Sequence, residues 1–136
     1  MKRKMIVTIA LAGIISICIA AIQPEKAASG EFKNLKVLPD SIGSKQLSKI
    51  MVDVFGDELG VSCNFCHTEN KDTHRPDYAS DEKPEKEIAR AMMRMTIGIN
   101  TTYFEQQRPM IGDSMLAVTC GTCHHGQPHP ENTGNQ

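Results

Sequence analysis

Apolar residues recur every three or four positions in two stretches of the chain, and this spacing predicts two amphipathic helices. The first helix is expected at residues 44–58, with Gly60 as a stop, and its apolar stripe consists of Leu47, Ile50, Met51, Val54 and Phe55. The second is expected from Pro84 to about Tyr103, with acidic residues favourable in its first turn. Its apolar positions are Ile88, Met92, Met95 and Ile99.

Polar segments separate these helices. Residues 34–39 are expected to form a short extended piece and residues 68–83 a polar loop, and Pro109 and Gly112 lie in a connector before a Cys-rich segment. The sequence pattern contains neither an alternation of helices and strands nor a run of strands. It therefore predicts a mainly α fold in which a helix, a loop and a Cys-rich segment follow one another once in each half.

The N-terminal segment is expected to direct export. Residues 1–21 combine a basic start with an apolar run and are typical of a Sec-type signal peptide, and the run at residues 5–22 also has the length of a possible membrane tether. Residues 22–33 are expected to be a linker, residues 34–130 the folded domain and residues 131–136 a flexible tail. The domain is therefore expected in the periplasm or another extracytoplasmic space.

Composition narrows the function. The chain has 136 residues and a formal net charge of −1, and beyond residue 21 it has 12 basic and 16 acidic residues. This balance argues against nucleic acid as a partner and is compatible with a redox partner protein. Aromatic residues make up 4%, so side chains alone would give a thin core. A large buried prosthetic group would fill that core.

Two Cys-x-x-Cys-His pentads carry the chemistry. Their residues are Cys63, Cys66 and His67 in the first pentad and Cys120, Cys123 and His124 in the second. Each pentad has the spacing of a c-type haem attachment site, with two thiols about one helical turn apart and an imidazole beside them. The thiols would form thioethers with the haem, and the imidazole would be the proximal iron ligand. The sequence therefore predicts two covalently bound haem c groups.

Three other readings of the cysteines are weaker. A four-Cys zinc site requires closer pairs and leaves the His after each pair unexplained. A thioredoxin-type redox pair requires a βαβ context, which the sequence pattern lacks. Two structural disulfides are plausible in an exported protein, but a chance His after both pairs is rare when the chain has 5 His in 136 residues.

Each iron needs a sixth ligand or has an open site. Met51 and Met92 lie on helical stripes upstream of the two pentads, and a thioether ligand raises the reduction potential relative to a second imidazole. Met on such a stripe is also ordinary core filling. Other candidate ligands are Met93, Met95, Met110, Met115, His74, His125 and His129. Candidates to offset the charge of haem propionates are Arg75, Arg90 and Arg94.

Three segments within residues 34–130 resemble the cytochrome c subunit family of photosynthetic reaction centres. They are residues 59–67 (LGVSCNFCH), residues 87–100 (EIARAMMRMTIGIN) and residues 118–126 (VTCGTCHHG). In that family each haem lies parallel to a helix whose Met is the sixth ligand. The Met-x-x-Met-Thr-x-x-Ile-Asn pattern of the family implies Met92 as the sixth ligand of the second haem.

The resemblance also implies Met51 as the sixth ligand of the first haem. Met51 is one residue further from Cys63 than in the closest family pattern, which would place the sulfur at Val52. His125 is a second departure, since the family commonly has Arg there. The family subunit carries four haems and this chain has two pentads, so the resemblance implies the haem-binding unit without identifying a partner.

The fold expected from these observations is mainly α and cytochrome c-like, with two helix, loop and Cys-x-x-Cys-His units packed around two covalently bound haems. The expected function is electron transfer by a dihaem c-type cytochrome with His/Met-ligated irons, without catalysis of its own. The alternative is a haem-based redox enzyme or gas sensor with one five-coordinate iron.

Overall fold

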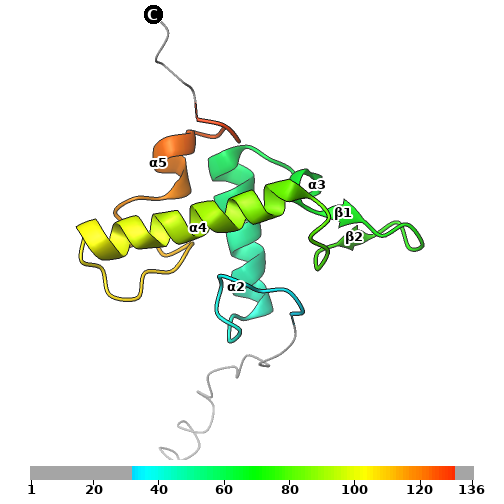
Figure 1. Cartoon of the computed structure of the whole chain (residues 1–136), viewed down its shortest axis with the longest axis horizontal. Coiled ribbons are helices and arrows are strands. Elements are labelled where there is room, and N and C mark those ends of the chain that lie inside the picture. The colour runs from blue at the N-terminus through cyan, green and yellow to red at the C-terminus, as the bar shows by residue number, and fades with distance from the viewer. Residues whose placement is uncertain (1–31, 131–136) are drawn as a thin grey trace, which may run out of the picture.

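The computed structural model describes residues 32–130, and its helices follow the predicted order (Figure 1). In chain order the elements are α2 (Ser44–Lys49), η1 (Ile50–Asp57), α3 (Cys63–Cys66), β1 (Thr68–Glu69), β2 (Pro76–Asp77), α4 (Pro84–Tyr103) and α5 (Cys120–His124). The mainly α fold is confirmed. The signal or anchor at residues 1–21, the tail at residues 131–136 and all but the last two linker residues lie outside the described residues. No helix within residues 32–130 is long and apolar enough to cross a membrane.

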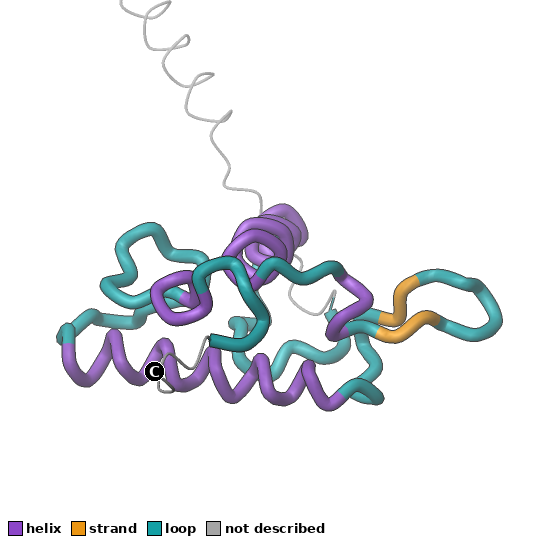
Figure 2. Tube along the Cα trace, turned by 90° about the horizontal axis from the view of Figure 1, so that it is seen from above, coloured by secondary structure: helices purple, strands orange, loops and turns teal. Residues whose placement is uncertain are grey.

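The continuous helix α2–η1 crosses α4, and the two pentads lie on either side of η1. Figure 2 shows α2–η1 almost end-on above α4, with the short helices α3 and α5 to its two sides. α3 contacts α4, and α5 contacts η1. The crossing therefore places each pentad in the angle between the two long helices (Figure 1).

The first helix begins at Ser44, as predicted, but its winding changes at Ile50. From Ile50 to Asp57 it is a π-helix, in which hydrogen bonds join residues five apart instead of four. Ile50 and Val54 are its buried residues. Gly112 fits closely against them, because a Cβ at this glycine would lie 2.7 Å from Cγ1 of Ile50. The expected α-helix at residues 44–58 is thus part α and part π.

α4 has the predicted bounds, but its inward face differs from its apolar stripe. The buried residues of α4 are Lys86, Arg90, Met93, Thr96 and Asn100. On the apolar stripe, Ile88 is 59% exposed, Met92 is 38% exposed and Met95 is 49% exposed. α4 therefore turns a largely polar face toward the rest of the described chain and leaves its apolar face open.

The segment predicted as a polar loop at residues 68–83 contains a short antiparallel ladder. Thr68 pairs with Asp77 and Glu69 pairs with Pro76. The side chain of Asn70 accepts a hydrogen bond from the Thr73 backbone and closes the turn between the strands. This pairing corrects the expectation of an unpaired loop.

The described hydrophobic core is small. Its buried apolar residues are Leu38, Ile42, Ile50, Val54, Met93 and Ile111. Phe32 and Phe55 pack against this cluster but are only partly buried. The low aromatic content of the sequence thus corresponds to a small core, around which several apolar side chains are only partly buried.

The end of η1 packs directly against the second pentad. The carbonyl oxygen of Glu58 accepts a 3.0 Å hydrogen bond from the N–H of Gly126, and its carboxylate accepts one from the N–H of Gly121. Gly60 has φ +63°, and a Cβ there would overlap the backbone carbonyl of Gly126. The segment that leads into the first pentad is therefore in contact with the backbone of the second.

Gly60→Ala is expected to destabilise the protein by about 2–4 kcal/mol, because Ala resists this positive φ and its Cβ would collide with Gly126. Equilibrium unfolding in urea measures the change. Gly98→Ala in α4 is the control, since a Cβ there meets nothing within 4 Å and should stabilise the helix by about 0.5–1 kcal/mol. An unchanged midpoint for Gly60→Ala would show that this junction is not closely packed.

Candidate functional site

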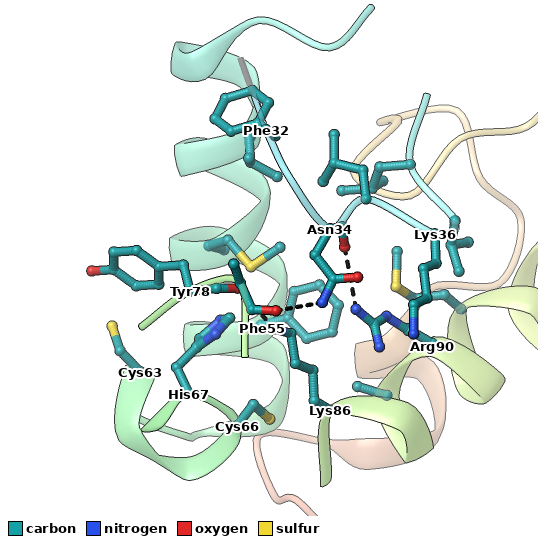
Figure 3. Close-up of a pocket in the computed structure, with 18 of the residues that line it drawn as sticks. Phe32, Asn34, Lys36, Phe55, Cys63, Cys66, His67, Tyr78, Lys86 and Arg90 are labelled. Carbon is teal, nitrogen blue, oxygen red and sulfur yellow. Dashed lines mark hydrogen bonds between the residues drawn. The ribbon is translucent and has the colours of Figure 1, made fainter. Parts of the chain in front are cut away.

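A cavity of about 670 Å³ lies beside the first pentad (Figure 3). Its wall includes the thiols of Cys63 and Cys66 on α3, the imidazole of His67 that follows them, and Met51 of η1. The volume falls within the range of about 300–1,000 Å³ that is usual for ligand sites. The structure thus brings together the four groups that the sequence assigns to the first site.

His67 is half-buried beside this cavity. Its ring meets that of Tyr78 edge to face, with centroids 5.1 Å apart. Burial lowers the pKa of the His67 imidazole, and the nearby Lys86 and Arg90 lower it further. Its Nδ1 atom is buried and has no hydrogen-bond partner among the described residues. His67 therefore presents a neutral imidazole with unused nitrogen capacity, as a metal ligand requires.

Lys86 of α4 fixes the segment that carries Tyr78. Its Nζ atom donates to the carbonyl oxygen of Tyr78 at 2.7 Å and to that of Ser80 at 2.5 Å. The Lys86 side chain is 11% exposed and lines the cavity. Because these carbonyls accept its hydrogen bonds, Lys86 holds Tyr78 beside the ring of His67.

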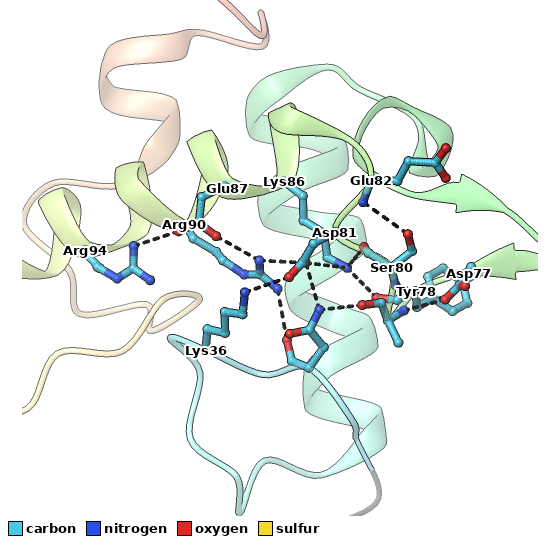
Figure 4. Close-up of polar contacts among 12 residues, drawn as sticks. Lys36, Asp77, Tyr78, Ser80, Asp81, Glu82, Lys86, Glu87, Arg90 and Arg94 are labelled. Atoms are coloured by element: carbon cyan, nitrogen blue, oxygen red, sulfur yellow. Dashed lines mark hydrogen bonds and ion pairs between the residues drawn. The ribbon is translucent and has the colours of Figure 1, made fainter.

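An ion-pair network fastens residues 32–38, which form one wall of the cavity, to α4 (Figure 4). Arg90 donates to Asp81 at 2.8 Å and to the carbonyl of Asn34 at 3.2 Å. Asp81 also accepts hydrogen bonds from Lys36 at 2.7 Å and from Asn34 at 2.8 Å. Lys36, followed by Arg90 and Asn34, holds the pKa of Asp81 well below its usual range. Asp81 thus joins the cavity wall to the helix.

The second pentad lies on α5, whose first turn is capped by side chains. Thr119 and Thr122 exchange hydrogen bonds between side chain and backbone in a capping box. Glu58 adds a carboxylate 2.5 Å from the N–H of Gly121. Burial and then Glu58 raise the pKa of the Cys120 thiol to about 11. The position of α5 is therefore fixed by its own sequence and by the end of η1.

His124 has its ring oriented by the backbone. Its Nδ1 atom lies 2.9 Å from the carbonyl oxygen of Gln127. Because a carbonyl can only accept, Nδ1 is the donor in this contact, and Nε2 is the ring nitrogen that takes no part in it. A carbonyl in this position is the usual outer partner of a metal-ligating His.

The two neighbouring methionines of α4 belong to different surroundings. Met92 lies on the open apolar face of α4 and is 38% exposed. Met93, a candidate for the second site, is instead 5% exposed and lines the first cavity. The groups predicted for the second haem therefore lie on two elements, the pentad on α5 and Met92 on the exposed face of α4.

The remaining candidate residues are mostly at the surface. His74 forms a 2.7 Å pair with Glu69, and Arg94 forms a 3.4 Å pair with Glu87. The exposed candidates include Arg75, Met95, Met115, His125 and His129, and Met110 is partly buried. Of the three arginines suggested for propionates, Arg90 lines the first cavity.

The cysteines bear on the alternative readings. The four described cysteines are free thiols, and the two pairs lie on either side of η1. Within residues 32–130 no group of three or more His, Cys, Asp or Glu side chains is placed to hold a metal ion. The four-Cys zinc arrangement is therefore not formed in the part of the chain that the structure describes.

Sequence reasoning missed several residues that contribute to the two sites. Lys86 and Glu58 are charged residues in helical stretches, where charge usually marks a solvated face. Tyr78 and Asp81 lie in a segment interpreted as a polar loop. Nothing in their spacing indicates that Lys86 bonds the Tyr78 carbonyl, that Asp81 pairs with Arg90 or that Glu58 contacts Gly121. These contacts depend on how the segments pack in three dimensions.

The chain is mainly α, and its two pentads lie at short helices. Thiols, an imidazole and a thioether surround one cavity. These features define a c-type cytochrome. The family model described as photosynthetic reaction centre cytochrome C subunit matches residues 4–135. The chain belongs to this family.

Two curated relatives agree with this assignment. The chain is 35% identical over 107 residues to the photosynthetic reaction center cytochrome c subunit of Rubrivivax gelatinosus, a match that covers 76% of this chain and 25% of the relative. It is 32% identical over 96 residues to cytochrome c-554 of Chloroflexus aurantiacus, a match that covers 71% of this chain and 21% of the relative. The chain thus spans about a quarter of the length of the curated relatives that it matches.

Proposed function

We propose that this protein is a dihaem c-type cytochrome that transfers single electrons with two His/Met-ligated irons. The observation that carries the proposal is the first cavity, where two thiols and an imidazole from the first pentad meet a thioether from η1. These groups are the donor set of a c-type haem. Membership of a cytochrome family supports the same reading.

At the first site, Cys63 and Cys66 would hold haem covalently, and His67 and Met51 would be its axial ligands. The fit rests on the cavity volume and on the buried, unpartnered nitrogen of His67. When bound, haem supplies a metal centre that accepts and releases one electron. Tyr78 orients the His67 ring, and the segment held by Asp81 excludes water from one side of the cavity.

At the second site, Cys120 and Cys123 would hold haem, with His124 and Met92 as axial ligands. The support is the carbonyl of Gln127, which keeps the proton on Nδ1 of His124 and leaves Nε2 for metal. The open apolar face of α4 offers Met92 among Ile88, Met95 and Ile99. An apolar macrocycle against this face would remove it from water.

We further propose that the protein acts outside the cytoplasm, in the periplasm or an equivalent space. Covalent haem attachment there agrees with the Sec-type signal expected at residues 1–21, and residues 5–22 would serve as a tether if they remain uncleaved. The proposed partners are redox proteins that exchange single electrons with it.

The test is the haem content of the full chain made in a host that matures c-type cytochromes. We expect the native mass to include two haems and the alkaline pyridine haemochrome to give two haems per chain. The paired change Cys63→Ala and Cys66→Ala should leave one haem, and the pair Cys120→Ala and Cys123→Ala should leave the other. A colourless protein without added mass would reject the proposal.

The same preparation separates electron transfer from the alternative, a redox enzyme or gas sensor. If both irons have two axial ligands, CO and cyanide should leave the Soret band of the native protein unchanged. A band that shifts on addition of CO to the reduced protein would indicate a five-coordinate iron and favour the alternative.

A further inference from the structure

The charged groups beside the two pentads differ in sign, and this difference bears on the proposed electron transfer. The first cavity is lined by four cationic residues, Lys33, Lys36, Lys86 and Arg90, and by one carboxylate, that of Asp57. The second pentad is in contact with a carboxylate, because Glu58 accepts the N–H of Gly121. The charged groups that line the first cavity are therefore mainly cationic, whereas the charged group bound to the second pentad is anionic.

The cations of the first site act more strongly than the acidic groups paired with them. The side chains of Arg90 and Lys86 are 7% and 11% exposed, whereas those of Asp81 and Glu87 are 40% and 58% exposed. Water screens exposed charges far more than buried ones. Lys86 is also bonded chiefly to carbonyl oxygens and lies 3.6 Å from Asp81, so its charge is incompletely neutralised.

Positive charge near a redox centre stabilises its reduced form, and negative charge stabilises its oxidised form.

We propose that Lys86 and Arg90 give the first site a higher reduction potential than the second, where Glu58 lowers it. This inference rests on the proposed function. An electron accepted at the second site from a one-electron donor then moves downhill to the first. The second site is oxidised and the first reduced by one electron, and no bond is made or broken.

A spectroelectrochemical titration of the haem-loaded full chain tests the proposal. Two one-electron waves are expected. Lys86→Gln, which keeps a donor for the Tyr78 carbonyl, should lower the potential of the higher wave and leave the lower wave in place. Glu58→Gln should raise the lower wave alone. Lys86→Arg and the exposed Lys45→Gln of α2 are the controls and should move neither wave appreciably.

The assignment of the waves has an independent measurement. The variant with Cys120→Ala and Cys123→Ala keeps the first site alone, and its single wave should match the higher one. The proposal is overturned if the two waves coincide, if that single wave matches the lower one, or if Lys86→Gln moves the lower wave. Two haems with the opposite order of potentials would refute this inference and leave the proposed function intact, whereas absence of haem would refute both.

Discussion

Met92→Ala is expected to remove the near-infrared His/Met band of one haem and to lower the reduction potential of that haem by about 0.1 V. Axial ligation spans about 0.8 V among haem proteins, and loss of a thioether favours ferric iron. Near-infrared absorption of the oxidised protein and a redox titration measure the two changes. The first haem should keep its band, since Met92 does not line the first cavity.

The chain provides matched controls for this substitution. Met95→Ala removes a thioether from the same open face of α4 and should leave both bands in place. Met51→Ala should produce the corresponding loss at the first site. An unchanged spectrum for Met92→Ala would reject Met92 as the ligand and return Met95 to consideration.

Asn100→Leu is expected to destabilise the protein by about 2–4 kcal/mol, because it leaves buried backbone groups without partners. The Asn100 side chain is fully buried. Its Nδ2 atom donates to the carbonyls of Thr96 at 2.9 Å and Val118 at 2.7 Å. Its Oδ1 atom accepts from the N–H groups of Ala117 at 2.8 Å and Val118 at 3.1 Å. Thermal unfolding of the haem-loaded protein measures the loss.

The bonds from Asn100 to Ala117 and Val118 allow a second measurement, the access of small ligands to the second site. Val118 lies two residues before Cys120, the first residue of the second pentad, so Asn100 holds the approach to Cys120 against α4. The second site should therefore become more accessible to CO or cyanide in Asn100→Leu, while the first should not. Thr101→Ala removes an exposed hydroxyl bond on the same helix and should change stability by less than about 0.5 kcal/mol. Equal effects of the two substitutions would contradict this role for Asn100.

Sequence periodicity predicted the long helices but not how they pack. The bounds of α4 follow from Pro84 and from helical spacing, and the structure confirms them. The spacing also marks Ile88, Met92, Met95 and Ile99 as one face, yet the first three are exposed and Ile99 is only partly buried. Periodicity describes which residues share a face, whereas burial depends on what that face meets. A face that meets a prosthetic group looks the same in the sequence as one that meets protein.

The sequence predicted the residues of the pentads but not the residues that surround the first of them. The pentads are visible because their chemistry depends on spacing within five residues, and the first cavity gathers Met51 with the three groups of its pentad. The roles of Asn34 and Asp81 could not be predicted, because these residues are more than forty positions apart in the sequence and meet only in the folded chain. The role of Lys86 could not be predicted either, because it depends on how the segment with Tyr78 folds back onto α4. The ligand roles of Met51 and Met92 remain predictions.

The π-helical winding of η1 has a consequence for sequence length. A helix bonded from each residue to the fifth along holds more residues per turn than an α-helix, so an inserted residue can be accommodated without lengthening the element. By the family resemblance the sulfur is expected one residue nearer to Cys63, at Val52, and η1 spans most of the interval between Met51 and Cys63. The wider turns of η1 can therefore hold the additional residue within the same length of helix.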